Sequence, residues 1–217
     1  MERKYGLSQE LLKIIACVTM LIDHVGAVFF PASLEWRIIG RLAFPIYCFL
    51  MAEGMALTRN VKKYGIRLAI GAVLAEVPFD LLFFGKLTLA HQSVMITLLI
   101  GYGMVLLMRR FPRFQIFILF CGGIVADLLA TDYGSLGVLI IGMFVLTREM
   151  KYRTLIQTVL LAGLNWYWNG YWVQMFAVAA MLPIALYSGK KSSHSKLVQW
   201  IFYLFYPVHL TILLLLS

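Results

Sequence analysis

The sequence predicts an all-α membrane protein, a polytopic bundle of about nine transmembrane helices. Three observations support this fold class: 62% of the 217 residues are hydrophobic and 13% are charged, the mean hydropathy is +0.86, and the charges fall mostly between apolar segments. A soluble domain has an apolar share nearer one half. The composition therefore excludes a soluble domain, and the placement of the charges argues against nucleic acid as the partner of this basic chain.

Apolar segments follow one another along the whole chain. They lie at about 8–30, 36–58, 66–85, 92–109, 113–130, 134–148, 154–169, 171–187 and 197–216. Several are shorter than the ~20 residues that cross a hydrocarbon core. The first segment lacks a small-residue cleavage site after a short core, so we expect no cleavable signal peptide. The longest polar interval, 188–196, is a loop that is too short to fold as a separate aqueous domain. We therefore expect one membrane domain over residues 1–217.

The basic residues indicate the orientation. With a cytoplasmic N-terminus, all but three of the 19 Lys and Arg residues fall on the cytoplasmic side. The three exceptions are Arg37, Arg41 and Lys86. The positive-inside rule then predicts an N-in, C-out topology in a bacterial cytoplasmic membrane. The densest basic cluster serves topology alone or also holds phosphates. It consists of Arg59, Lys62, Lys63 and Arg67.

Ionisable residues on four predicted helices fall at a similar depth below the outer membrane surface. With a rise of ~1.5 Å per residue, they lie about 7–12 Å below the outer ends of their helices. They are Asp23, His24, Arg41, Asp80 and His209. A charged group at membrane depth needs a partner or water. We expect these residues to meet in one layer, either as a functional site or as a structural ion-pair network.

His24 is the predicted base of this layer, because an imidazole titrates near pH 6.5 and accepts a proton at neutral pH. Adjacent residues project ~100° apart on a helix, so Asp23 and His24 do not both face one atom. Asp23 or Asp80 is expected to orient the ring and to stabilise its cationic form. Glu53 and Glu76 either pair with arginines or line a passage from the cytoplasm.

Two further groups of polar residues have plainer interpretations. An acidic group at the turn between the fifth and sixth segments is either a solvated loop or a substrate rim. It consists of Asp127, Asp132 and the neighbouring Tyr133. The three cysteines lack ligand-like spacing, so we expect packing residues and no metal site. They are Cys17, Cys48 and Cys121.

Short motifs distributed along most of the chain carry a resemblance. The motifs are at 12–16, 22–26, 39–47, 52–54, 58–60, 64–68, 76–80, 93–98, 133–134 and 202–210. Taken in order, they resemble the TraX family of membrane proteins, named for the conjugative F-pilin acetylase. That family is related to multi-span acyltransferases that act on sugars and cell-envelope polymers. The pattern departs at Ser93 and Ser188, where asparagine is more usual.

The resemblance implies acyl transfer from acetyl-CoA, or a similar thioester, to an amine or a hydroxyl. A histidine on the first helix is the catalytic residue in the related acyltransferases, which maps onto His24, and Arg41 lies in a shared motif. The candidate catalytic residues are His24, Asp23, Arg41 and Asp80. The candidate contacts to substrate and acyl-CoA are Arg59, Lys62, Lys63, Tyr64, Arg67, Glu53, Glu76, Thr97, Tyr206 and His209.

In the expected mechanism, acyl-CoA docks its phosphates on the basic cytoplasmic cluster and the acceptor arrives from the outer face. His24 deprotonates the acceptor or carries the acyl group itself, while Arg41 stabilises the oxyanion. The expected partners are acyl-CoA, membrane lipids and an envelope peptide, glycan or lipid as acceptor. The competing function is a proton-coupled transporter, although the two halves show no repeat. A non-catalytic assembly factor for surface appendages would leave the polar layer without a purpose.

Overall fold

The computed structural model describes residues 6–169, 172–189 and 196–217. Within these ranges the chain folds into helices, with two isolated β-bridges and no strand. This confirms the predicted all-α class. Some of the basic residues predicted to lie on the cytoplasmic side fall outside the described ranges. They are Arg3, Lys4, Lys190 and Lys191.

The chain divides into two compact units, and each is built from stretches that are remote in sequence. The first unit comprises Met1–Leu50, Thr147–Phe202 and Ser217. The second unit comprises Met51–Leu146 and Tyr203–Leu216. Helices α3 (Ala43–Leu57) and α10 (Lys196–Leu216) each contribute to both units. The single membrane domain expected from hydropathy stays a prediction.

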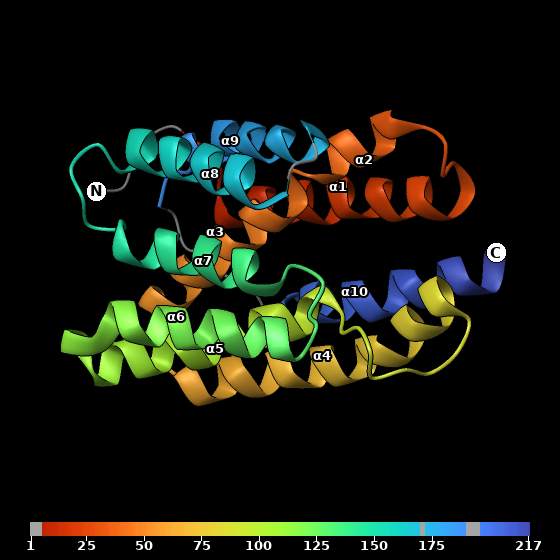
Figure 1. Ribbon diagram of the computed structural model, residues 1–217, viewed down its shortest axis with the longest axis horizontal. Helices are drawn as coiled ribbons and strands as arrows, with labels where there is room; N and C mark the ends of the chain where they lie inside the picture. Colours follow the sequence, from red (N-terminus) through yellow and green to blue (C-terminus); the bar gives the residue numbers. More distant parts are fainter. Residues whose placement is uncertain (1–5, 170–171, 190–195) are drawn as a thin grey trace. The chain divides into compact units, whose positions relative to one another are not determined.

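In the first unit, a tight helical hairpin follows the N-terminus. Helix α1 (Gln9–Phe29) begins after Ser8, whose hydroxyl accepts a hydrogen bond from the Leu11 amide at 3.3 Å. Helix α2 (Leu34–Gly40) turns back beside α1 (Figure 1). The two helices approach closely at Gly26, where a Cβ would lie 2.1 Å from the Cβ of Trp36. A larger residue at position 26 would therefore separate α1 from α2.

The remainder of the first unit comes from the second half of the chain. Helix α8 (Arg153–Asn169) is followed by a 3₁₀ helix, η2 (Trp172–Ala180), and by α9 (Met181–Ala185). The 3₁₀ helix lies against both α8 and α2. Two backbone hydrogen bonds join the start of the chain to the segment after α9, from the Leu7 amide to Leu186 and from the Ser188 amide to Leu7.

The second unit contains helices α4 to α7. Helix α4 (Val61–Phe84) begins after Asn60, whose side chain accepts from the Lys63 amide at 2.9 Å. It ends at Gly85, whose φ of +67° favours glycine. Helices α5 (Val94–Arg110), α6 (Gln115–Leu128) and α7 (Gly134–Leu146) then pack side by side (Figure 1). A short 3₁₀ helix, η1 (Pro112–Phe114), joins α5 to α6.

Every predicted apolar segment coincides with a helix or with two consecutive helices. Two boundaries differ: the second segment is interrupted after Gly40, and α4 begins at Val61 rather than near residue 66. By length and composition, three helical stretches of the described chain suffice to cross a membrane. They are Gln9–Phe29, Leu34–Leu57 and Val198–Leu216. Two shorter apolar helices are Gly134–Leu146 and Trp172–Ala185.

Candidate functional site

The strongest polar network of the first unit is centred on Asp23 in α1. Its Oδ2 accepts from Nη1 of Arg37 at 3.0 Å, and its Oδ1 accepts from Nη2 of Arg41 at 3.1 Å. The side chains of Asp23 and Arg41 are only 14% and 15% exposed, whereas that of Arg37 is 37% exposed. The Asp23 carboxylate, which is mostly shielded from solvent, therefore holds one similarly shielded guanidinium and one partly solvated guanidinium.

The sequence of the hairpin explains this arrangement. Arg37 and Arg41 are four residues apart, which places them on one face of a helical turn. Gly40 lies between them, and a Cβ there would lie 2.2 Å from Oδ1 of Asp23. Glycine at position 40 thus leaves the space that the carboxylate occupies. Any side chain there would displace Asp23 or push α2 away from α1.

Arg41 is fixed from three directions. Besides the carboxylate of Asp23, its Nη1 donates to Oε1 of Gln174 in η2 at 3.0 Å, and its Nε donates to the Arg37 carbonyl at 3.2 Å. Gln174 is itself buried. This set, the Asp23 network, consists of Asp23, Arg37, Arg41 and Gln174. It carries two guanidinium groups for one carboxylate, and so a net positive charge.

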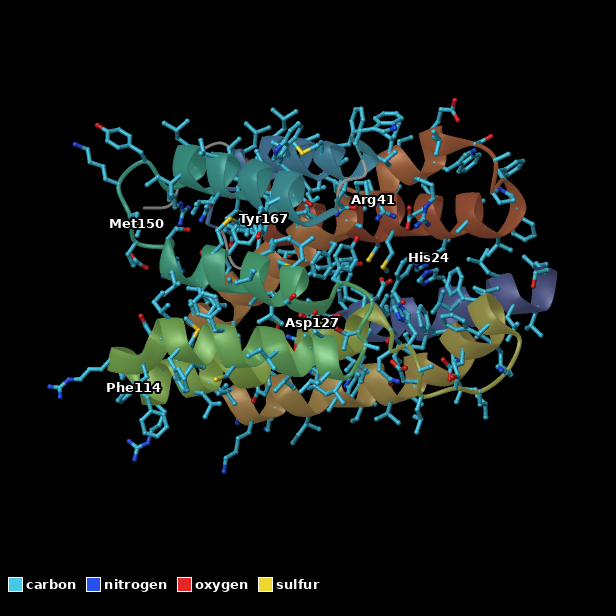
Figure 2. All side chains as sticks on the ribbon, viewed as in Figure 1. His24, Arg41, Phe114, Asp127, Met150 and Tyr167 are labelled. Atoms are coloured by element: carbon cyan, nitrogen blue, oxygen red, sulfur yellow. The ribbon has the colours of Figure 1, made fainter. Side chains whose placement is uncertain are left out.

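His24 follows Asp23 directly on α1 and is half-buried. In the view of Figure 2, His24 lies on the side of the α1 ribbon away from α2, whereas Arg41 lies on the side toward it. This agrees with the ~100° that separates consecutive helical residues. The first unit thus brings Asp23 and Arg41 into contact, with His24 at the next position along the helix.

The remaining predicted members of the layer, Asp80 and His209, belong to the second unit. His209 is buried on α10, where its Nδ1 lies 2.7 Å from the Phe205 carbonyl oxygen and its ring stacks on that of Phe205. It also meets Tyr206 edge to face. Convergence of all five residues in one layer stays a prediction.

A second polar group occupies the second unit between α4 and α5. The Ser93 hydroxyl, at the start of α5, donates to Oε1 of Glu76 on α4, and the Ser93 amide donates to the same oxygen at 3.2 Å. One turn after Glu76, Asp80 is buried and its Oδ2 accepts from the Thr88 amide at 2.8 Å. Thr97, one turn after Ser93, is fully buried.

The predicted phosphate-binding cluster lies at the start of α4. Arg59, Lys62 and Lys63 are exposed there. Arg67, one turn further, lies over the ring of Tyr203 with its guanidinium carbon 5.4 Å from the ring centroid. Three tyrosines pack together beside it. The Tyr64 ring centroid lies 6.0 Å from that of Tyr102 and 6.2 Å from that of Tyr203. Tyr64 was predicted as a contact residue, whereas Tyr102 and Tyr203 were not. Glu53 and Tyr206 are buried elsewhere in this unit.

The acidic turn between α6 and α7 has a structural role at one position. Oδ1 of Asp127 accepts from the Ser135 amide at 2.7 Å, which satisfies a donor at the start of α7 (Figure 2). Asp132 lies 3.7 Å from Nε2 of His91, and both side chains are partly exposed. The Asp132 carboxylate raises the pKa of His91 above its ordinary value, against a smaller opposing effect of burial.

Two members of the Asp23 network were not predicted. Arg37 was counted only among the three basic residues toward the outer side, although its spacing of four residues from Arg41 was a usable signal. Gln174 carried no such signal in the sequence, because it is a neutral residue within an apolar segment. Its role follows from the packing of η2 against α2.

Comparisons with known proteins match most of the chain. The family model described as TraX protein matches residues 8–217. A probable fimbrial assembly protein FimC, serogroup H1, from Dichelobacter nodosus is 29% identical over 245 residues, covering 98% of this chain and 97% of the relative. An uncharacterized protein of Rickettsia prowazekii (strain Madrid E) is 25% identical over 155 residues, covering 71% of this chain and 54% of the relative. No solved structure matches the chain.

Proposed function

The chain belongs to the TraX family, and from this membership we propose that it is a membrane acyltransferase. It moves an acyl group, acetyl in the simplest case, from acyl-CoA to an amine or hydroxyl of the cell envelope. The observation that carries the proposal is the Asp23 network, a partly buried arginine-rich group directly beside the half-buried His24. Such a group supplies a base and a positive charge at one place.

We propose that the nine apolar segments cross the cytoplasmic membrane with the N-terminus inside. Besides the three long apolar helices, helices of the second unit expose apolar stripes at helical spacing, as lipid contact requires. On α4 the stripe consists of Ile66, Ile70, Val73 and Val77. On α6 it consists of Ile116, Phe120, Ile124 and Leu128. The basic residues then fall mainly on the cytoplasmic side.

His24 is the proposed base. It takes the proton from the acceptor nitrogen or oxygen as that atom attacks the carbonyl carbon of the thioester. The carbon–sulfur bond breaks, the acyl group stays on the acceptor, and the CoA thiolate leaves and takes up a proton. In the covalent alternative, the His24 ring carries the acyl group between two such steps. The covalent route predicts ping-pong kinetics.

Arg41 is the proposed electrostatic partner of the reaction. Its guanidinium is held by Asp23, Gln174 and the Arg37 carbonyl, so little reorganisation is needed when negative charge develops on the thioester oxygen. Because two arginines face one carboxylate, the network retains a positive charge for that oxyanion. Asp23 then serves as a positioning residue for Arg41.

The proposed contact for the nucleotide of acyl-CoA is the basic and aromatic group at the start of α4. Arg59, Lys62 and Lys63 offer exposed cations to phosphates. Tyr64 and Tyr203 offer aromatic rings beside Arg67, which suit a planar base. The acceptor is a peptide amino terminus, a glycan or a lipid, and the name of the Dichelobacter relative favours a fimbrial subunit among these.

The test uses the purified protein in lipid nanodiscs with acetyl-CoA, and measures released CoA by chromatography. Chromatography avoids thiol reagents that would also label the exposed Cys121. We expect release that rises with an added amine or hydroxyl acceptor. Acetyl-CoA left intact in the presence of fimbrial and envelope acceptors would contradict the proposal. Flux of a solute into vesicles without acetyl-CoA would instead support the transporter.

A non-catalytic assembly factor is the second candidate, because the Dichelobacter relative is described as a probable fimbrial assembly protein. The two functions differ in one measurable respect. An assembly factor leaves the mass of the surface subunits unchanged, whereas a transferase adds an acetyl group. Mass spectrometry of surface proteins and envelope polymers, from cells with and without this protein, therefore separates them.

A further inference from the structure

The polar group between α4 and α5 has features of a binding site of its own. Glu76 and Asp80 are one turn apart on α4, and Ser93 and Thr97 are one turn apart at the start of α5, so each pair shares a helix face. The hydrogen bonds from Ser93 to Glu76 bring the two faces together. We call these four residues the α4–α5 polar cluster.

Two atoms of this cluster have unused bonding capacity. Asp80 is 5% exposed, and its Oδ1 has no hydrogen-bond partner among the described residues. Thr97 is 0% exposed, and its Oγ1 likewise has no partner in the described part of the chain. Buried polar atoms are nearly always hydrogen-bonded in native proteins, so each exception calls for a specific explanation. An isolated buried carboxylate oxygen is especially costly.

The negative charge of the cluster has no full complement of positive charge. Within the described ranges, neither Glu76 nor Asp80 forms an ion pair with a lysine or an arginine. His91 interacts electrostatically with Glu76, but its Nε2 is paired with Asp132 at 3.7 Å. The Asp80 carboxylate accepts a hydrogen bond from the loop amide of Thr88. The Glu76 carboxylate accepts hydrogen bonds from the Ser93 amide and hydroxyl. A positive charge is therefore the missing complement.

The geometry points to a binding site for a small monovalent cation, either an alkali metal ion or a protonated primary amine. Oδ1 of Asp80, the Glu76 carboxylate and Oγ1 of Thr97 are its oxygen ligands. A primary ammonium presents three N–H donors, which matches three acceptors. An alkali ion takes the same carboxylate and hydroxyl oxygens. Asp80, Glu76 and Thr97 were candidate site residues on sequence grounds, but the proposed base and its electrostatic partner are His24 and Arg41. Occupancy of the cation site is therefore measured without acyl transfer.

A divalent ion is a poorer match for these residues. Calcium takes six to eight oxygen ligands, and magnesium demands octahedral geometry. Among the described residues, no three His, Cys, Asp or Glu side chains converge as a metal-binding group. Two carboxylates and one hydroxyl match a monovalent cation better than a divalent one.

The test measures thermal unfolding of the full-length protein in nanodiscs at constant ionic strength. Choline chloride is replaced stepwise by sodium, potassium or methylammonium chloride. We expect at least one of these cations to raise the Tm saturably, by about 5 to 10 °C at a hundredfold excess over its Kd. The cation that acts identifies whether the site takes an alkali ion or an amine.

Thr97→Val is the decisive variant. It keeps the side-chain volume and removes a hydroxyl that bonds to nothing among the described residues, so it should unfold normally in choline chloride. We expect it to lose most of the cation-dependent shift, as should Asp80→Asn. Thr211→Val is the matched control, because that hydroxyl donates to the Pro207 carbonyl on α10, and it should keep the full shift.

Two results would overturn the site. The first is a Tm that depends on none of the three cations. The second is an equal shift in the wild type, Thr97→Val and Asp80→Asn, which would assign the effect to the bilayer or to surface charge.

Discussion

Asp23 in its network and Asp80 in the α4–α5 polar cluster are both largely shielded from solvent, but they differ in how their carboxylates are satisfied. Asp23 meets two guanidinium groups, and a neutral amide from Gln174 holds the buried one in place. Asp80 has no basic partner among the described residues and keeps one oxygen without a hydrogen bond. The first unit therefore holds a preorganised positive group, and the second unit holds an unsatisfied negative one.

This difference separates two uses of buried charge. A network whose members are held by hydrogen bonds and ion pairs positions its charges and costs little to reorganise, which suits stabilisation of a transition state. A buried carboxylate without a basic partner is costly by itself and is stabilised when a cation binds to it. The following substitutions test whether the two groups differ in this way.

The largest stability effect is expected for Asp23→Ala. It leaves Arg41 buried without its carboxylate, and breaking such a pair costs about 3 kcal/mol or more. Asp80→Asn should cost much less, because it removes a charge that has no basic partner. Chemical denaturation in nanodiscs compares the two variants. Equal losses would remove the distinction between the groups.

Arg37→Gln serves as the control within the same network. Arg37 is 37% exposed, so its ion pair is largely screened by solvent. Its loss should change the free energy of unfolding by less than about 1 kcal/mol. A cost equal to that of Asp23→Ala would show that Arg37 is more tightly held than its exposure indicates.

Gly40→Ala should cause the next largest loss in the free energy of unfolding. The added Cβ overlaps the Asp23 carboxylate, and overpacking of this kind costs about 1–3 kcal/mol. Gly163→Ala in α8 is the matched control, because nothing lies within 4 Å of a Cβ there. It should stabilise the helix by up to about 1 kcal/mol. The signs of the two effects should be opposite in the same denaturation assay, and a neutral Gly40→Ala would contradict the close approach.

Ser93→Ala tests the link between α4 and α5. It removes the hydroxyl that donates to Glu76, which should cost about 1–2 kcal/mol. Ser33→Ala is its control, since Ser33 also precedes a helix but its side chain makes no capping hydrogen bond. Its effect should be close to zero. Equal effects of the two variants would show that the Glu76 contact contributes nothing beyond the helix start.

The smallest effect concerns His91. Asp132 raises the pKa of His91, so the protonated ring stabilises the fold at acidic pH. That contribution is complete below the unfolded value of about 6.5 and is lost as the pH rises through the higher folded value. The imidazole titration followed by NMR should move toward 6.5 in Asp132→Asn. An unchanged midpoint would show that the Asp132 carboxylate does not set it.

The sequence predicted the fold far better than the pairing of the site residues. Hydropathy located the helices because burial in lipid or protein imposes long apolar runs. It missed the start of α4, since Lys62 and Lys63 are polar while Asn60 caps the helix. It also missed the break after Gly40, which places Arg41 beside Asp23.

Pairing was harder to predict because partners come from remote segments. Depth arguments grouped Asp23 with Arg41 correctly, yet helical depth says nothing of direction around a helix. Gln174 is a neutral residue 133 positions from Arg41, and no local pattern marks their contact. Asp127 differs from Gln174 in this respect. Its partner, the Ser135 amide near the start of α7, is only eight positions away in the sequence.

The most direct measurement is the rate of acetyl transfer from acetyl-CoA by the purified protein, comparing His24→Ala with His91→Asn. If His24 is the base, its removal should lower the rate by about 10²–10⁴-fold. His91→Asn, which changes a histidine of the loop before α5, should stay within a few fold of the wild type. A His24→Ala protein that transfers acetyl groups at the wild-type rate would contradict the proposed role of His24.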